Sequence, residues 1–211
     1  MMRKLLTAAV LGLGALALSG ITAGQSDART PGERYWDPGS GSWQVYRPVR
    51  RGGGVVSNRS PIRKRVVSYS KQYSPGTIII DTAERRLYYV MKRGKAMRYG
   101  IGVGRDGFRW SGRHRITRKA EWPGWTPPAR MIARVKRETG KQLKSYYPGG
   151  PNNPLGARAL YIGSTIYRIH GTNQPWTIGQ AMSSGCIRLA NDDVTDLFNR
   201  VKVGSRVIVR Q

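Results

Sequence analysis

The chain has 211 residues, enough for one ordinary domain with extensions, and a formal net charge of +26. Such a charge predicts binding to a polyanion, which leaves nucleic acid, anionic lipid and an acidic polymer open. The single cysteine excludes an intramolecular disulfide, and one cysteine with two histidines leaves no residues for a Cys/His metal cluster. We therefore expect neither a metal site nor an organic cofactor.

Residues 1–28 have the pattern of a secretory signal peptide. A short basic start is followed by an apolar run over 5–18, and a small-x-Ala cleavage pattern ends at Ala28. The run is short for a membrane span, although an uncleaved N-terminal anchor remains the alternative. Export to the periplasm or cell envelope argues against nucleic acid as the main partner and favours an acidic wall polymer.

Residues 29–74 are basic, poor in hydrophobic residues and interrupted by prolines and glycines. This composition predicts a segment with little regular structure. Four aromatic residues lie among its arginines: Tyr35, Trp36, Trp43 and Tyr46. They could stack on sugar rings or bases, or dock on the domain as parts of a linker. We expect the segment to bind the acidic wall polymer.

Alternating and β-branched residues begin at residue 77 and predict a mainly β domain over 75–211. Short polar links between the first predicted strands indicate antiparallel hairpins. The expected strands cover 77–81, 85–92, 95–102, 112–119, 159–163, 166–170 and 203–210. The proline-rich run at 122–128 predicts a rigid loop, either a cleft wall or a packed lid. Residues 129–144 have weak helical periodicity.

The last predicted helix spans 191–201. Asn191 is expected to cap its N-terminus, and two aspartates follow in the first turn, where carboxylates favour the helix dipole. Apolar residues recur at the helical spacing and predict one buried face: Val194, Leu197, Phe198 and Val201.

The stretch 168–191 contains the strongest candidates for chemistry. Cys186, the only cysteine, and His170 could form a thiolate nucleophile and its base, although each could equally be a buried structural residue. Gly185 permits a tight turn and leaves room for substrate. Its backbone N–H and that of Cys186 are candidate oxyanion donors. Arg188 supplies a permanent cation suited to a carboxylate. The second histidine, His114, lies between two arginines and is a poor candidate base.

This stretch resembles the active-site signature of the L,D-transpeptidase catalytic domain family, the YkuD-type domain. The matching pieces are His170-Gly171, a spacer, and Ser183-Ser184-Gly185-Cys186-Ile187-Arg188. The resemblance covers roughly residues 75–209. Many members carry a second histidine where Ser184 stands, so a role that requires a histidine there does not transfer. The resemblance implies a β-sandwich-like domain with the cysteine at one rim and a histidine oriented by a backbone carbonyl.

The resemblance also implies the reaction: Cys186 attacks a peptidoglycan stem peptide, releases D-alanine, and an amine resolves the thioester. That amine would belong to a stem diamino acid or to an envelope protein. Cys186 and His170 are the expected catalytic residues. Candidate substrate contacts are Arg188, Gly185, Ser184, Ser183, Gly171, Thr172 and Asn191. Arg188 could instead bond internally, and Thr172 and Asn191 could be structural. A carboxypeptidase or amidase at the same site, or a non-enzymatic polyanion-binding envelope protein, remain the alternatives.

Overall fold

The computed structural model describes residues 34–37, 42–45, 59–140 and 142–211. Residues 1–28, which are predicted to be a signal peptide, lie outside this part of the chain. Among the described helices, none has both the length and the apolar composition needed to cross a membrane.

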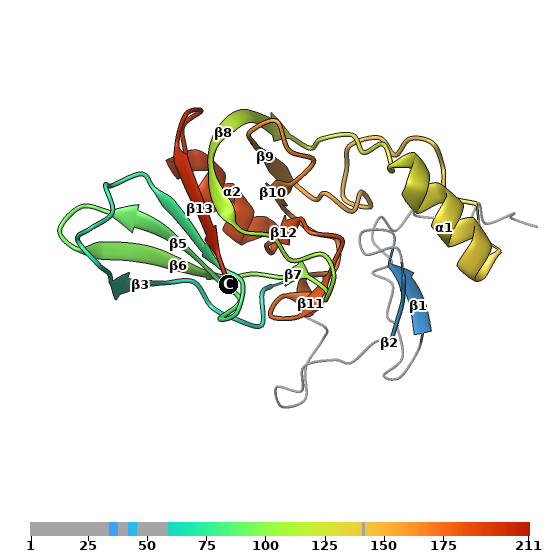
Figure 1. The fold of residues 1–211 in the computed structure, drawn as a ribbon, viewed down its shortest axis with the longest axis horizontal. Helices are drawn as coiled ribbons and strands as arrows, with labels where there is room; N and C mark the ends of the chain where they lie inside the picture. Colours follow the sequence, from blue (N-terminus) through green and yellow to red (C-terminus); the bar gives the residue numbers. More distant parts are fainter. Residues whose placement is uncertain (1–33, 38–41, 46–58, 141) are drawn as a thin grey trace, which may run out of the picture.

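A nine-stranded mixed sheet forms the body of the fold, in the order β12-β10-β9-β8-β13-β4-β5-β6-β3 (Figure 1). Its strands are β3 (Arg65–Ser68), β4 (Ile78–Asp81), β5 (Arg86–Met91), β6 (Lys95–Gly100), β8 (Gly112–Glu121), β9 (Arg158–Ile162), β10 (Arg168–His170), β12 (Ile187–Arg188) and β13 (Arg206–Arg210). Two smaller sheets pair β1 (Arg34–Asp37) with β2 (Ser42–Val45), and β7 (Val103–Gly104) with β11 (Ala181–Ser183). The helices are α1 (Ala129–Thr139), α2 (Asn191–Arg200) and the 3-10 turn η1 (Pro175–Thr177). The predicted mainly β, sandwich-like fold class is confirmed.

The connections explain how distant residues meet. Strands β4, β5 and β6 are antiparallel neighbours, as their short polar links predict. β13 runs parallel to β4 and antiparallel to β8, and therefore joins the first strands to the later ones. β9 and β10 form an antiparallel hairpin, whereas β10 and β12 are parallel. A parallel pair needs a crossover connection. The chain over 171–186 makes this connection between β10, which ends in the candidate histidine, and β12, which directly follows the candidate cysteine.

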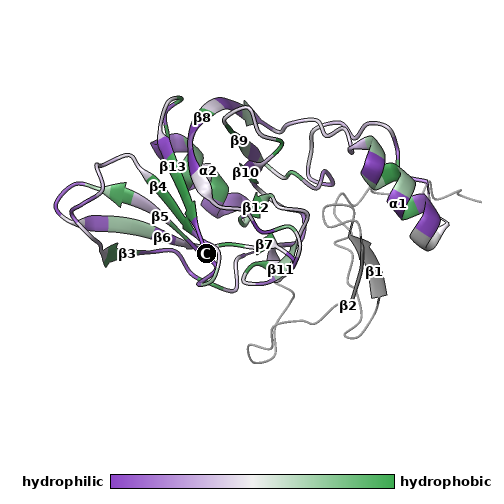
Figure 2. Cartoon of the chain, in the orientation of Figure 1, coloured by the Kyte–Doolittle hydropathy of each residue, from purple (hydrophilic) through white to green (hydrophobic). Residues whose placement is uncertain are grey.

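Helix α2 packs its apolar side on one face of the sheet. Val194 and Leu197, both fully buried, share a cluster with Ile169 of β10 and Ile187 of β12. Burying one such side chain stabilises the fold by about 1.5–3 kcal/mol. The predicted apolar stripe of the helix is confirmed, and its packing fixes the positions of β10 and β12. Strands β4 and β13, which are adjacent in the same sheet, are also coloured mainly as hydrophobic in Figure 2.

A β-bulge in β8 determines which side chains point away from this cluster. Ile116, before the irregularity, is buried opposite Ile162, whereas Arg118, just after it, lies opposite Tyr161 on the reverse face. A bulge inserts one residue and so shifts the alternation of side chains by one position. We call the face of the sheet that points away from the α2 cluster the outer face.

Of the basic segment 29–74, the structure describes 34–37, 42–45 and 59–74, which contain the hairpin β1–β2 and the edge strand β3, paired with β6. One prediction about the helices needs correction. Asn191 does not cap α2, because Ala190 occupies that position and the Asn191 side chain bonds elsewhere. In the proline-rich loop, Trp125 is 4% exposed and packs against α1, so this part of the loop is a packed element.

Candidate active site

The pairing of β10 with β12 brings the candidate residues together. The register sets Ile169 opposite Ile187 and His170 opposite Arg188. Both isoleucines are buried in the core, so side-chain alternation places Arg168, His170, Cys186 and Arg188 together on the outer face. The tripeptides Arg-Ile-His and Cys-Ile-Arg thus form a two-by-two block of polar side chains. The structure brings the predicted Cys186, His170 and Arg188 together and adds Arg168, which sequence reasoning missed.

Cys186 is a partly exposed free thiol directly before β12. Burial raises the pKa of this thiol above its ordinary value. The opposing influence on this pKa comes mainly from Arg168, through its charge and hydrogen bonding, and then from the charge of Arg188. The resting thiol is therefore protonated at neutral pH, and the nearby cations favour the thiolate once a base removes the proton.

His170 ends β10 and is 4% exposed. Burial, followed by the charge of Arg188, lowers the pKa of its imidazole from 6.5 to about 3, although backbone bonds to Gly171 and Leu155 act in the opposite direction. The ring is therefore neutral at physiological pH. Its Nδ1 lies 2.6 Å from the Gly171 carbonyl oxygen, which can only accept, so Nδ1 carries the proton. This assignment leaves Nε2 as the basic nitrogen.

Gly185 forms the turn before the cysteine and meets an aromatic pair. Its φ is +105°, and an added Cβ would lie 2.4 Å from Cε1 of Tyr167. Tyr167 stacks on Trp110 with ring centroids 4.4 Å apart, and the Trp110 Nε1 donates to the Gly185 carbonyl at 2.7 Å. Only glycine fits at this turn. Trp110 and Tyr167 are site residues that sequence reasoning missed, since nothing local links residue 110 to residue 185.

Ser183 shapes the same turn from inside. It is 1% exposed, and its Oγ donates to the Cys186 carbonyl at 2.6 Å and accepts from the Gly185 N–H at 3.2 Å. The Gly185 N–H therefore points into the turn, in contrast to its predicted role as an oxyanion donor. Ser184 is partly exposed beside the cysteine. Of this pair, Ser184 is the one placed to face a substrate.

Gly171, Thr172 and Asn191 form a latch behind the histidine. The Asn191 Oδ1 accepts from the backbone N–H of Ala157 at 2.9 Å and of Thr172 at 3.2 Å. An added Cβ on Gly171 would lie 2.3 Å from the same oxygen, so glycine is needed for this close approach. These contacts join the start of α2, the end of β10 and the chain before β9. The latch therefore fixes the Gly171 carbonyl that orients His170.

Arg188 lies deeper than its predicted role requires. It is 2% exposed, and its backbone forms two hydrogen bonds of 2.9 Å with Gly102. An added Cβ on Gly102 would lie 3.4 Å from the Arg188 Nε, so the side chain passes close over this glycine. Arg168 is only partly buried. Of the two cations, Arg168 is better placed to meet a substrate from solvent.

The arrangement provides a thiol, a neutral base with a fixed tautomer, and two permanent cations. No group of three potential His, Cys, Asp or Glu metal ligands occurs within 34–37, 42–45, 59–140 and 142–211. Such a site suits nucleophilic attack on a carbonyl, because the base can take the thiol proton while the cations stabilise the developing anion.

Known proteins resemble this chain in sequence and in fold. A family model for the L,D-transpeptidase catalytic domain (YkuD) matches residues 75–209. The probable L,D-transpeptidase YbiS of Escherichia coli K12 is 44% identical over 135 residues, which are 62% of this chain and 43% of that relative. This chain therefore aligns with less than half the length of that curated relative.

Two solved structures are also similar to parts of this chain. An L,D-transpeptidase from Mycobacterium smegmatis has a TM-score of 0.50 at 18% identity and covers 64% of this chain and 58% of its own, a likeness of fold. A crystal structure from Brucella melitensis, described as a probable carnitine operon oxidoreductase, is 45% identical with a TM-score of 0.48, over 71% of this chain and 94% of that chain. That description concerns the Brucella protein alone.

Proposed function

The chain belongs to the L,D-transpeptidase catalytic domain family, and from this membership and the site geometry we propose that it is a peptidoglycan L,D-transpeptidase that acts through a Cys186 thioester. The observation that carries the proposal is the parallel register of β10 and β12. It sets a thiol, a neutral imidazole and two arginines on one face at the rim of the sheet.

The first half-reaction acylates the enzyme. His170 Nε2 takes the proton of the Cys186 thiol as the sulfur attacks the carbonyl of a stem peptide, and a tetrahedral oxyanion forms. The C–N bond then breaks, and the protonated imidazole gives its proton to the departing amine of D-alanine. A thioester and a neutral histidine remain.

The second half-reaction transfers the acyl group. An acceptor amine, on a stem diamino acid or an envelope protein, attacks the thioester carbonyl and loses a proton to His170. The C–S bond breaks and the sulfur recovers that proton, so the enzyme returns to its resting state. If water replaces the amine, the same steps describe a carboxypeptidase.

Arg168 acts in this proposal as a positioning residue for the sulfur. The register of β10 and β12 sets it beside Cys186, it is the main influence that lowers the thiol pKa, and it is more accessible than Arg188. A hydrogen bond to an ionised group contributes about 1.5–3 kcal/mol. Arg168 therefore lowers the free energy of the attacking thiolate, and the more deeply buried Arg188 adds a second positive charge near it.

We also propose that the protein is exported and that its basic segment 29–74 holds it on the acidic wall polymer. The support is the signal-like pattern of residues 1–28 and the net charge of +26. Protein recovered from the cell envelope should begin at Arg29. An intact N-terminus there would favour the uncleaved anchor instead.

The test is the turnover of a purified tetrapeptide muropeptide, followed by separation of the products. Cross-linked dimers are expected with wild type, and trimmed monomers without dimers would favour the hydrolase. Cys186→Ala should abolish turnover, while its melting temperature stays close to that of wild type. Turnover retained in a folded Cys186→Ala variant would remove the nucleophile assignment.

A further inference from the structure

The outer face carries a row of arginines beyond the catalytic residues. β8 and β13 pair with Arg115 opposite Arg206 and with Arg113 opposite Ile208. Val207 and Val209, which alternate with these residues on β13, are buried in the core. The three arginines and Ile208 therefore share the outer face with the cysteine.

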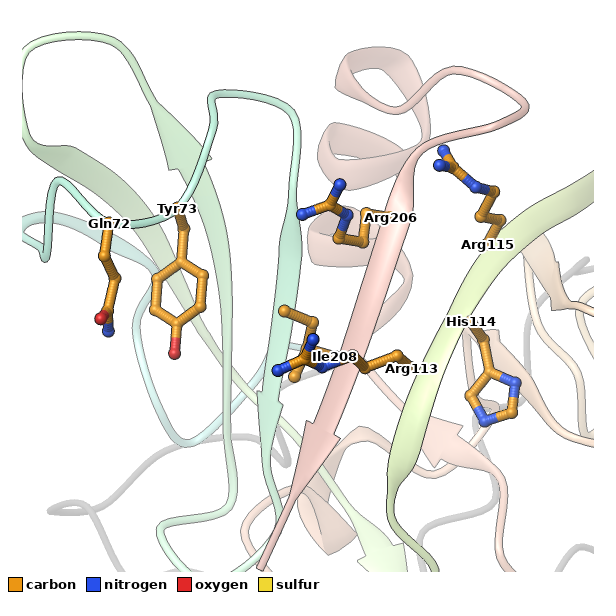
Figure 3. A pocket seen from close by; sticks show the side chains of 7 residues that line it. All are labelled: Gln72, Tyr73, Arg113, His114, Arg115, Arg206 and Ile208. Carbon is orange, nitrogen blue, oxygen red and sulfur yellow. The ribbon is translucent and has the colours of Figure 1, made fainter.

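These side chains line a groove of about 610 Å³. Gln72 and Tyr73, from the loop before β4, border it on the opposite side (Figure 3). Arg113 reaches across β13 beside Ile208, so its guanidinium lies over the groove (Figure 3). His114 also borders the groove, but it pairs with the buried Val207, and its ring meets the Trp110 ring at 5.6 Å on the other side of β8.

The charges in the groove are not balanced within the fold. Like charges directly opposite each other on antiparallel strands destabilise a sheet, and Arg206 faces Arg115 in this way. Arg115 donates to the Gly204 carbonyl at 2.8 Å, whereas Arg113 and Arg206 form no ion pair with any carboxylate that the structure describes. Asp81, on neighbouring β4, is already paired with Arg210 at 2.9 Å. An arrangement that costs stability without an internal partner indicates a ligand of opposite charge.

The row continues from the groove to the thiol. After the bulge in β8, Arg118 lies opposite Tyr161 of β9, and Tyr161 lies opposite Arg168 of β10. The Tyr161 ring meets the Arg118 guanidinium at 3.5 Å and that of Arg168 at 5.6 Å. The register of β10 and β12, with Ile169 opposite Ile187, in turn sets Arg168 beside Cys186. The arginine track, defined as Arg113, Arg115, Arg206, Arg118 and Arg168, therefore runs along one face to the nucleophile.

We propose that the arginine track binds the peptide stems of peptidoglycan through their carboxylates and so holds the polymer beside Cys186. A guanidinium forms two parallel hydrogen bonds to a carboxylate, and stem peptides present several carboxylates in succession. The groove begins the track and Arg168 ends it at the thiol. This inference rests on the proposed function and adds the surface that recognises its substrate.

The test is co-sedimentation of the full-length protein with insoluble peptidoglycan, in a Cys186→Ala background so that no thioester forms. The groove variant is Arg113→Gln/Arg206→Gln. Its matched control, Arg130→Gln/Arg137→Gln, removes the same charge from exposed positions on α1. The concentration for half-maximal binding should rise about five- to tenfold in the groove variant, as expected for two exposed ion pairs, and less than twofold in the control.

Peptidoglycan whose carboxyls have been converted to amides distinguishes binding to carboxylates from binding to other groups of the polymer. On this material the groove variant and the unsubstituted background should bind equally. Equal losses in both double variants would overturn the proposal, since binding would then follow net charge. Selective loss on amidated peptidoglycan, or selective loss of binding to polyphosphate alone, would assign the groove to another ligand. Because the assay needs no turnover, its failure is distinct from a failure of the proposed thioester chemistry.

Discussion

Replacing Asn191 by alanine is expected to lower the free energy of unfolding by about 2–6 kcal/mol. The Asn191 Oδ1 accepts from two backbone N–H groups, those of Ala157 and Thr172, which are 6% and 2% exposed. Without that oxygen, both buried donors lose their partner, and each unsatisfied donor costs about 1–3 kcal/mol. For a chain of this size, at about 2–4 °C per kcal/mol, the melting temperature should fall by roughly 4–24 °C.

Two variants control this experiment. Asn191→Asp keeps an oxygen in the same place and should retain most of the stability, whereas Asn199→Ala changes an exposed position on α2 and should have an effect within about 0.5 kcal/mol. Thermal unfolding followed by circular dichroism gives the comparison. An Asn191→Ala variant that melts within 2 °C of Asn199→Ala, a margin of about 1 kcal/mol, would refute the latch.

Three further results are expected. Because burial and then Arg188 lower the His170 pKa to about 3, the neutral imidazole stabilises the fold above pH 6.5, and this contribution falls by about 1.4 kcal/mol per pH unit below it. In urea unfolding, the free energy of unfolding of wild type should therefore fall by about 2 kcal/mol more than that of His170→Gln between pH 7 and 5. Equal losses in the two proteins would mean that the native ring gains a proton in this range, as the unfolded ring does. Gly185→Ala combines a positive φ with a clash against an aromatic ring and should lose about 2–5 kcal/mol, so an unchanged melt would disprove the turn geometry. Arg168→Gln should slow alkylation of the thiol by iodoacetamide at pH 7 by about tenfold or more, and Arg168→Lys by less, whereas three equal rates would exclude Arg168 as the thiol's partner.

The sequence predicted the parts of the fold that depend on local pattern. Alternation and short polar links identified strands β4, β5 and β6, and the spacing of Val194 and Leu197 identified α2 with its buried face. Edge strand β3 was missed because four residues with basic neighbours resemble a linker. Charged residues are common on edge strands, where they discourage pairing with other chains, so composition alone misleads there.

The site was predictable only in part. Cys186 and His170 follow from a compound motif, whereas Arg168 depends on the register between β10 and β12, which join across a crossover. The repeated polar-apolar-polar pattern of Arg-Ile-His and Cys-Ile-Arg was the available signal for a shared face. Asn191 was assigned to a cap because its type suits that position, but its tertiary contacts with the chain before β9 and after β10 take precedence.

The most direct measurement is the intact mass of the protein after incubation with a tetrapeptide muropeptide, with the adduct mapped by peptide digestion. We expect wild type to gain the mass of the acyl donor minus D-alanine on Cys186, and His170→Ala to gain none. An unmodified wild-type Cys186 that still reacts with iodoacetamide would contradict the account, since the thiol would be accessible and the stem peptide would not be its substrate.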